Sequence, residues 1–372
     1  MSQGFSLKDQ LFNPEKLGYL AGLFQDASSA FDRQAFEQDV LAEMPALELK
    51  QRIDLIARML DRHLPQDQNA CFEILAAALP APLDPTLKDD DFGDFIFAPL
   101  GELVVARGLE TPDTALPMLA EITKRFSMEY AIRPFLNAHT DQVFEQMQDW
   151  AGDANYHVRR LVSEGTRPKL PWGIKIEVDP LAPLPLLERL HSDGTRYVTR
   201  SVANHLNDLS KIAPTEMMDQ LDDWEKSARQ SRGEMTWLKS HALRTLIKKG
   251  DSRALAQVGY RDDVPVQGSL SLAPNPIAMD AELVLNAEIT AAQDLPVLVD
   301  YVLWFHRPDG REASKVFKWK QDKIKAGKTL NLTKKRRLKG NASTFTLHPG
   351  PHKIGLQVNG NVIAEAPFEL TA

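Results

Sequence analysis

The residues best suited to chemistry are three carboxylates that lie in arginine-rich helical segments, Glu129, Glu164 and Asp208. A carboxylate fixed beside a reacting atom can stabilise positive charge in a transition state and can orient a water molecule for attack. The neighbouring arginines favour an anionic ligand such as phosphate, because a guanidinium offers several donors in a planar fork. The combination predicts a surface that binds a charged substrate.

Each carboxylate also has a purely structural interpretation. Glu164 follows Arg160 by four residues, so the two could form a salt bridge on one helix face. Asp208 could be a surface acid near the end of its helix, where the helix dipole makes a negative charge mildly unfavourable. Glu129 has arginines four residues before and after it, which is also the pattern of a charged ladder on a solvated face. The sequence leaves both interpretations open for all three carboxylates.

Three further side chains could contact a ligand near these carboxylates. Trp172 lies in the proline-bounded segment RPKLPWG, where its indole could either fill the core or stack on a cationic group. Asn204 shares a helix face with Asp208. Trp237 begins a helical segment, a position that more often belongs to the core. Trp172, Asn204 and Trp237 are therefore the predicted contacts to the ligand.

Glu164 and Asp208 lie on a helical unit that occurs three times, in residues 156–167, 197–208 and 237–248. Val158, Val198 and Leu238 recur at a step of about 40 residues, which is typical of HEAT-type helical repeats. Stacked repeats place equivalent residues side by side on one surface. The cations that we expect to bind phosphate there are Arg159, Arg160, Arg167, Arg200, Arg244, Lys248 and Lys249.

The helical pattern ends near residue 256, and a different pattern follows. From residue 264 to 372 the chain contains short runs of β-branched residues, such as AELVLNAEIT and LPVLVDYVLWF, separated by turn residues. Strands at this spacing are typical of an antiparallel sandwich of immunoglobulin type. We therefore predict a mainly α protein, with a HEAT-like helical repeat solenoid over 1–256 and an all-β immunoglobulin-like sandwich over 264–372.

Charge is distributed unevenly along the chain. Between residues 307 and 339, basic residues far outnumber acidic ones, and the run KKRR at 334–337 falls in a predicted loop. Such a segment could be a solvated loop, but its density favours binding to phosphate through Lys334, Lys335, Arg336 and Arg337. The acidic segment 88–94, KDDDFGD, would repel an anionic ligand. We expect that segment to lie on the convex side of the solenoid or to have a structural role as a helix cap.

Composition excludes several classes of protein. The chain has 372 residues, enough for two domains, and its formal net charge of −7 is not that of a simple basic nucleic-acid binder. Its only cysteine, Cys71, excludes a disulfide framework and a zinc site of several thiolates. The histidines lack metal-ligand spacing, so we expect neither a metal nor a cofactor. Without a signal-peptide pattern or a membrane-spanning apolar stretch, we expect a cytoplasmic protein.

Four long motifs connect these features to a known family. They are DDDFGDFIFAPLGE (89–102), HVRRLVSEGTRPKLPWG (157–173), RSVANHLNDLSK (200–211) and HALRTLIKKGD (241–251). They closely resemble the bacterial DNA alkylation repair glycosylases of the AlkC type, which are HEAT-like proteins related to AlkD. The resemblance covers about 250 residues. The basic sandwich is similar to the immunoglobulin-like extension found in a subset of that family.

The resemblance implies a hydrolase that excises positively charged bases, such as 3-methyladenine, from duplex DNA without fully flipping them. We also expect this hydrolase to be monofunctional. Glu164, Asp208 and Glu129 would then stabilise the oxocarbenium-like sugar and orient the attacking water. The expected partner is double-stranded DNA, bound by a monomer that associates with the nucleoid. We see no lysine isolated on an apolar face, which disfavours a Schiff-base mechanism. The alternative is a non-catalytic HEAT-repeat scaffold that binds DNA or protein.

Overall fold

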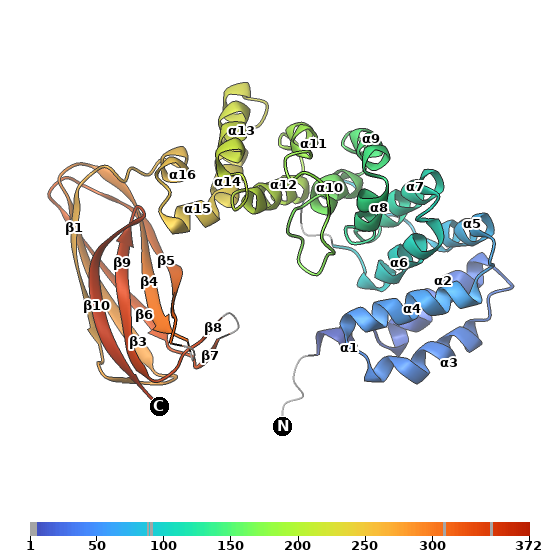
Figure 1. Ribbon diagram of the computed structural model, residues 1–372, viewed down its shortest axis with the longest axis horizontal. Helices are drawn as coiled ribbons and strands as arrows, with labels where there is room; N and C mark the ends of the chain where they lie inside the picture. Colours follow the sequence, from blue (N-terminus) through green and yellow to red (C-terminus); the bar gives the residue numbers. More distant parts are fainter. Residues whose placement is uncertain (1–5, 88, 90–91, 308–309, 343–344) are drawn as a thin grey trace. The chain divides into compact units, whose positions relative to one another are not determined.

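The computed structural model describes residues 6–87, 89, 92–307, 310–342 and 345–372. The chain divides into two compact units, Met1–Ala242 and Leu243–Ala372. The first unit is helical, and the second is mostly β (Figure 1). This confirms the predicted fold class. No helix among the described residues is long and apolar enough to cross a membrane.

The first unit consists of helices joined by mostly short connections (Figure 1). They are α1 (Leu7–Leu11), α2 (Pro14–Ala27), α3 (Arg33–Glu43), α4 (Leu49–His63), α5 (Gln68–Ala78), α6 (Ala98–Gly108), α7 (Pro112–Thr123), α8 (Ile132–Ala138), α9 (Thr140–Trp150), α10 (Tyr156–Gly165), α11 (Leu184–Leu190), α12 (Arg196–Leu209), α13 (Pro214–Ser227) and α14 (Arg232–Ala242). Two short 3-10 helices, η1 (Met44–Ala46) and η2 (Phe95–Phe97), complete the unit. Longer connections precede η2 and join α10 to α11.

The repeated sequence unit forms one layer of the solenoid. Helix α12 packs between α10 and α14, while α9, α11 and α13 lie in a second layer (Figure 1). Local sequence explains where α10 starts, because the Asn155 side chain accepts a hydrogen bond from the amide of His157 and caps the first turn. Val158, Leu161 and Val162 are then fully buried between helices. Packing of this apolar face holds the neighbouring polar residues in register.

The third copy of the repeat differs from the other two. Its helix is interrupted at Leu243, where α14 ends and α15 (Arg244–Lys249) begins. Helix α15 and the following α16 (Ser252–Gln257) belong to the second compact unit. The division between units therefore lies earlier in the chain than the predicted end of the helical domain at residue 256.

The second unit is a sandwich of two mainly antiparallel sheets with a small hairpin (Figure 1). Its strands are β1 (Val266–Ala273), β2 (Ile277–Ala278), β3 (Glu282–Ala291), β4 (Leu295–His306), β5 (Glu312–Ile324), β6 (Thr329–Arg337), β7 (Asn341–Ala342), β8 (Phe345–Thr346), β9 (Gly350–Val358) and β10 (Asn361–Thr371). One sheet has the order β1-β3-β6, the other the order β2-β10-β9-β4-β5. The short β2 pairs in parallel with β10.

The run 334–337 lies in strand β6, so the prediction of a loop there was wrong. In the β3–β6 register, Lys335 pairs with Val284 and Arg336 pairs with Leu283. Alternation along the strand sends Lys335 and Arg337 to the exposed face, while Lys334 and Arg336 are half-buried. The four cations therefore do not form one continuous patch.

Helices α15 and α16 are joined to the sandwich through the β9–β10 turn. Gln357 donates to the backbone carbonyl of Lys248 over 3.5 Å. The backbones of Gly250 and Gly360 also meet, and a Cβ placed on Gly250 would lie 2.7 Å from the Gly360 oxygen. Gly250 has a φ of +76°, which ends α15 in the left-handed region. The close approach of the two backbones and the positive φ together explain why residue 250 is a glycine.

Candidate active site

Glu164 lies at the centre of a buried charged cluster on the first unit. It is 4% exposed in the last turn of α10. Its Oε1 accepts a hydrogen bond from Arg167 at 2.6 Å, and its Oε2 accepts one from Ser201 of α12 at 2.6 Å. Arg160 approaches the same Oε2 at 3.5 Å. The i,i+4 salt bridge expected from sequence is therefore the longest of the three contacts.

Arg160 connects Glu164 to Glu129. Its Nη1 donates to Glu129 Oε2 over 2.7 Å and to the Ser127 hydroxyl over 3.0 Å. Glu129 lies in the connection between α7 and α8, far from Arg160 in sequence. The charged ladder considered for Glu129 does not form. Instead, Arg125 donates to Glu121 and to the Pro80 carbonyl, and Arg133 donates to the carbonyls of residues 165, 167 and 174.

Arg167 connects Glu164 to Asp208. Its Nε donates to Asp208 Oδ2 over 2.9 Å, while its Nη1 donates to Glu164. Asp208 is 3% exposed near the C-terminal end of α12, so it is a buried rather than a surface acid. Lys211 lies 3.4 Å from Asp208 Oδ1, with a third of its side chain exposed. Two arginines thus hold the three predicted carboxylates together across successive repeats.

The electrostatics of the cluster favour the charged form of Glu164. Burial alone would raise the pKa of Glu164, but Arg160, Arg167 and the Ser201 hydrogen bond hold it below its ordinary value of 4.5. Burial, with help from Glu129 and Glu164, raises the pKa of Tyr130 to about 12. Tyr197 is likewise held to a pKa of about 12 by burial. These phenols stay neutral at pH 7, so the charge of the cluster is set by carboxylates and arginines.

A small cavity adjoins the cluster through Tyr130, which follows Glu129 in the chain. It has a volume of about 120 Å³ and is lined by Phe95, Glu102, Tyr130 and Trp172, among others. Trp172 is 58% exposed and has a φ of 65°, and its carbonyl accepts a hydrogen bond from Lys50 at 2.8 Å. The core-filling interpretation of Trp172 was therefore wrong, because its indole faces solvent at the edge of this cavity.

Two known proteins resemble this chain over almost its full length. The C-terminal Ig-like domain family of the uncharacterised protein YhaZ matches residues 267–372. The protein YhaZ of Bacillus subtilis (strain 168) is 31% identical over 366 residues, which cover 97% of this chain and 98% of that protein. A solved structure of the Pseudomonas fluorescens alkylpurine DNA glycosylase AlkC, bound to DNA containing an abasic site analogue, matches with a TM-score of 0.88. It is 30% identical and covers 99% of this chain and 100% of that one. This chain belongs to the AlkC family.

In this AlkC-family chain, Asn204 and Trp237 form a second group on α12 and α14. His241 Nε2 lies 2.9 Å from Asn204 Oδ1, and the His241 ring stacks on Trp237 with centroids 5.0 Å apart. The guanidinium of Arg196 lies 3.9 Å from the centre of the Trp237 ring. Trp237 is only partly buried. Its ring contacts a histidine ring and a guanidinium.

Several of the predicted phosphate-binding cations already have protein partners. Arg159 binds Asp193 through two hydrogen bonds, of 2.5 and 3.1 Å, and Arg200 pairs with Asp89. Arg244, Lys248 and Lys249 lie on α15 in the second unit. Burial raises the pKa of Asp300 in that unit to about 6, although Lys248 and Lys318 act against the rise. A phosphate would have to compete with, or share, these partners.

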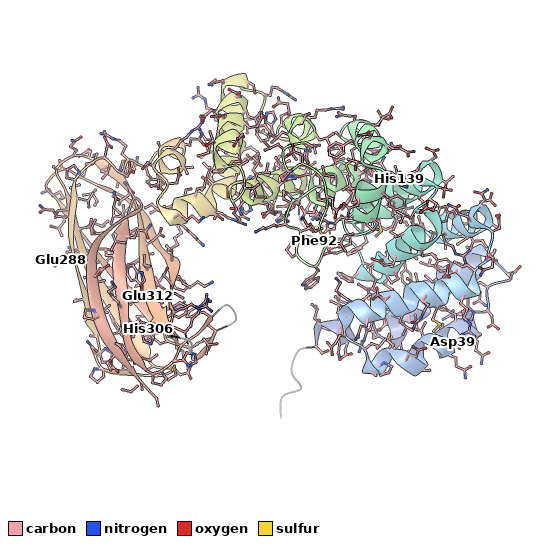
Figure 2. The ribbon with its side chains drawn as sticks, in the orientation of Figure 1. Asp39, Phe92, His139, Glu288, His306 and Glu312 are labelled. Atoms are coloured by element: carbon pink, nitrogen blue, oxygen red, sulfur yellow. The ribbon has the colours of Figure 1, made fainter. Side chains whose placement is uncertain are left out.

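The described residues of the acidic segment 88–94 have two roles: Asp94 caps η2 by accepting a hydrogen bond from the amide of Ile96, as expected for a helix cap, whereas Asp89 and Phe92 contact the arginine-rich face rather than a convex side. Asp89 pairs with Arg200, and the Phe92 ring meets Tyr197 edge-on with centroids 5.4 Å apart. The guanidinium of Arg160 lies 4.5 Å from the centre of that Tyr197 ring. Phe92 is half-exposed at this position (Figure 2). Lys88, Asp90 and Asp91 lie outside the described residues.

Sequence reasoning missed several residues of the site, most clearly Ser201, Ser163 and Tyr130. A comparison of the repeats could have found the serines, because Ser201 occupies the position of Leu161 in the preceding copy. It also missed that Lys239 is buried, with its ammonium 2.7 Å from Glu225. Among the described residues, histidines, cysteines and carboxylates form no group that could hold a metal ion.

Proposed function

We propose that this chain is a DNA glycosylase that hydrolyses the N-glycosidic bond of positively charged alkylated bases in duplex DNA. The observation that carries the proposal is the buried cluster of Glu129, Glu164 and Asp208, held by Arg160 and Arg167 across neighbouring repeats. Membership of the AlkC family supports it, because the solved relative is an alkylpurine DNA glycosylase bound to DNA with an abasic site analogue.

The chemistry follows from the charge of the substrate. A purine alkylated at N3 already carries positive charge in the nucleoside, so it can leave without being protonated. The positive charge then moves to the deoxyribose, and ionised carboxylates stabilise it by direct electrostatic attraction. Glu164 and Asp208 are the candidates for this role and for orienting the attacking water, since both are buried and share Arg167. Glu129 supports them through Arg160.

The same electrostatics predict substrate selectivity. The pKa of Glu164 is held below its ordinary value, so this carboxyl group has no proton to give a neutral leaving base at pH 7. We expect efficient release of 3-methyladenine and little or no release of uracil or hypoxanthine. Chromatography of the free bases released from matched duplexes measures both rates. Rapid excision of uracil would contradict a mechanism without a general acid.

DNA binding would combine two basic regions. On the repeats, Arg159, Arg160, Arg167 and Arg200 would contact phosphates or hold the groups that do, and on α15 Arg244, Lys248 and Lys249 would extend the contacts. Trp172, Asn204 and Trp237 would contact the lesion or its sugar. Lys334, Lys335, Arg336 and Arg337 would bind the backbone from the sandwich. We propose that one monomer binds one duplex and leaves the base within or close to its stack, without complete flipping.

We propose a monofunctional enzyme, without a covalent lysine intermediate. Among the described residues, Lys211 is the lysine that pairs with a carboxylate of the cluster. It is partly exposed, and its ammonium lies near Asp208. The buried Lys239 is paired with Glu225 of α13, not with the cluster. Reduction with borohydride during turnover should therefore trap no protein–DNA adduct. A trapped adduct at either lysine would refute this part of the proposal.

The alternative is a binding scaffold that has no catalytic activity. Its support is that every carboxylate of the cluster is ion-paired, which is also how a purely structural network looks. Incubation with duplex DNA methylated on its bases distinguishes the two functions. Release of free 3-methyladenine under single-turnover conditions supports the glycosylase, whereas tight binding with release at the uncatalysed rate supports the scaffold.

A further inference from the structure

Two buried serines connect α10 and α12 directly behind Glu164. Ser201 Oγ lies 2.6 Å from Glu164 Oε2 and 3.0 Å from Ser163 Oγ. A carboxylate can only accept hydrogen bonds, so the single hydroxyl proton of Ser201 is directed to Glu164. Ser163 then donates its own proton to Ser201. The chain of hydrogen bonds runs in one direction, from Ser163 through Ser201 to the carboxylate.

Apolar packing alone does not explain serine at these positions. Ser201 stands where the preceding repeat has Leu161, and Ser163 stands where the next repeat has Ala203. Both serines are buried. Burying a hydroxyl is unfavourable unless it is hydrogen-bonded, so an apolar residue would serve packing better. The polar residues at two apolar repeat positions indicate that their hydrogen bonds are needed.

We propose that Ser201 is a positioning residue that orients the carboxylate of Glu164, and that Ser163 fixes the direction of the Ser201 hydroxyl. The proposal rests on the glycosylase function proposed above. Arg167 occupies Oε1 and Ser201 occupies Oε2, so the carboxylate cannot rotate without losing one bond. Each oxygen can still accept a further hydrogen bond, from water or from the substrate.

The surroundings favour positioning over proton transfer. His205 holds the same joint, because its Nδ1 lies 3.0 Å from the Ser163 carbonyl. Burial lowers the pKa of His205 to about 4, so its ring is neutral at pH 7 and donates through Nδ1. The other titratable groups around Glu164 are Arg160, Arg167, Tyr130, Tyr197 and Asp208. Ser163 and His205 are both fully buried, so the chain ends inside the protein rather than in solvent.

The test compares Ser201→Ala and Ser201→Cys with Ser210→Ala in the full-length protein. Cysteine keeps the shape of the side chain with a somewhat larger atom, but it is a weak donor. Ser210 is a matched control, because it is also buried in the same helix region but donates only to the Asn207 carbonyl. We expect both Ser201 variants to lose about tenfold in single-turnover excision, as for loss of a hydrogen bond to a charged group. We expect Ser210→Ala to stay within about twofold of the parent.

Two readouts separate positioning from general packing. Loss of the Ser201 bond should raise the pKa of Glu164, so the acidic limb of the pH–rate profile should move to higher pH. In a Glu164→Gln background, Ser201→Ala should have little further effect, because the two residues act as one unit. An unshifted acidic limb together with additive losses would overturn the proposal.

A titration decides the matter independently of activity. Carbon-13 NMR of the glutamate carboxyl groups, with Glu164→Gln to assign the signal, gives the pKa of Glu164 in the parent and in Ser201→Ala. A higher pKa in the variant supports the proposal, and an unchanged pKa rejects it. If the parent chain releases no base from methylated DNA, the glycosylase function fails, yet this titration still shows whether Ser201 controls the carboxylate.

Discussion

The carboxylate cluster of the repeats and the basic edge of the sandwich use charge in opposite ways. In the cluster, Glu164 and Asp208 are almost fully buried, and each is bound by arginine at a fixed distance. On strands β5 and β6, which are edge strands of the two sheets, the lysines are mostly exposed. Buried paired charges specify a geometry, since moving either partner leaves an uncompensated charge. Exposed cations can supply affinity for an anionic ligand such as DNA, and added salt weakens that affinity by screening the charges.

Removal of the central arginine should have the largest effect. Arg167→Met would leave Glu164 and Asp208 buried without their shared cation, which should lower the free energy of unfolding by about 3–5 kcal/mol. Urea unfolding at pH 7 measures the change. Arg58→Met is the control, because Arg58 is exposed and its pair with exposed Glu43, at 3.2 Å, should contribute less than about 1 kcal/mol. Equal losses of unfolding free energy in the two variants would show that the buried cluster stabilises the fold no more than an exposed ion pair does.

The pH dependence of that stability has a defined sign. The pKa of Glu164 is lowered in the folded protein, so its ionisation stabilises the fold above the ordinary value of 4.5. That contribution is lost as pH falls through the lower, folded pKa. The difference in unfolding free energy between parent and Arg167→Met should therefore shrink as the pH is lowered below 4.5. A difference that grows on acidification would contradict the assignment of charges.

Neutral replacement of the carboxylates should abolish most of the excision activity without loss of binding. Glu164→Gln and Asp208→Asn should each slow single-turnover release by two to three decades, about 3–4 kcal/mol of transition-state stabilisation. Glu129→Gln should cost less, because it acts through Arg160. The matched control is Glu121→Gln, whose carboxylate pairs with Lys124 and Arg125 outside the cluster. Near-parental rates in all three cluster variants would refute the proposed site.

The sequence predicted the carboxylates better than it predicted their partners. The repeat step of about 40 residues places Glu164 near α12, and family motifs surround both Glu164 and Asp208. The sequence could not show that Arg125 and Arg133 donate hydrogen bonds to backbone carbonyls. Glu129 therefore pairs with Arg160 instead of with either of them. That choice depends on how the connection between α7 and α8 is packed.

The sandwich shows the same limit. A run of four cations is a poor strand by propensity, so residues 334–337 were predicted to be a loop. Pairing with the apolar strand β3 overrides that preference, and Arg336 lies with its guanidinium 4.4 Å from the centre of the Phe317 ring. Similarly, the third repeat helix has an unbroken apolar pattern, and only the tertiary structure shows its interruption at Leu243.

Neutralising the exposed cations of β6 should weaken DNA binding by a smaller amount. Lys335→Gln combined with Arg337→Gln should lower affinity and reduce the slope of log K against log salt by about 1 for each phosphate that the variant no longer neutralises. Lys226→Gln, an exposed lysine of α13 paired with Asp223, is the control. Titrations by fluorescence anisotropy at several salt concentrations measure both quantities. An unchanged slope would show that the exposed face of β6 does not bind DNA.

The smallest effect is expected from Asp89, the carboxylate that meets Arg200 beside the cluster. A negative charge at this position both occupies Arg200 and repels phosphate. Asp89→Asn should therefore raise affinity for unmodified duplex DNA by a few-fold, because an exposed charge pair contributes no more than about 1 kcal/mol. Asp84→Asn is the matched control, since Asp84 lies in the same connection but forms only a local turn with Thr86. If Asp89→Asn instead weakens binding while Asp84→Asn does not, the Asp89 pair holds Arg200 in its DNA-binding position, and the acidic segment assists binding rather than competing with it.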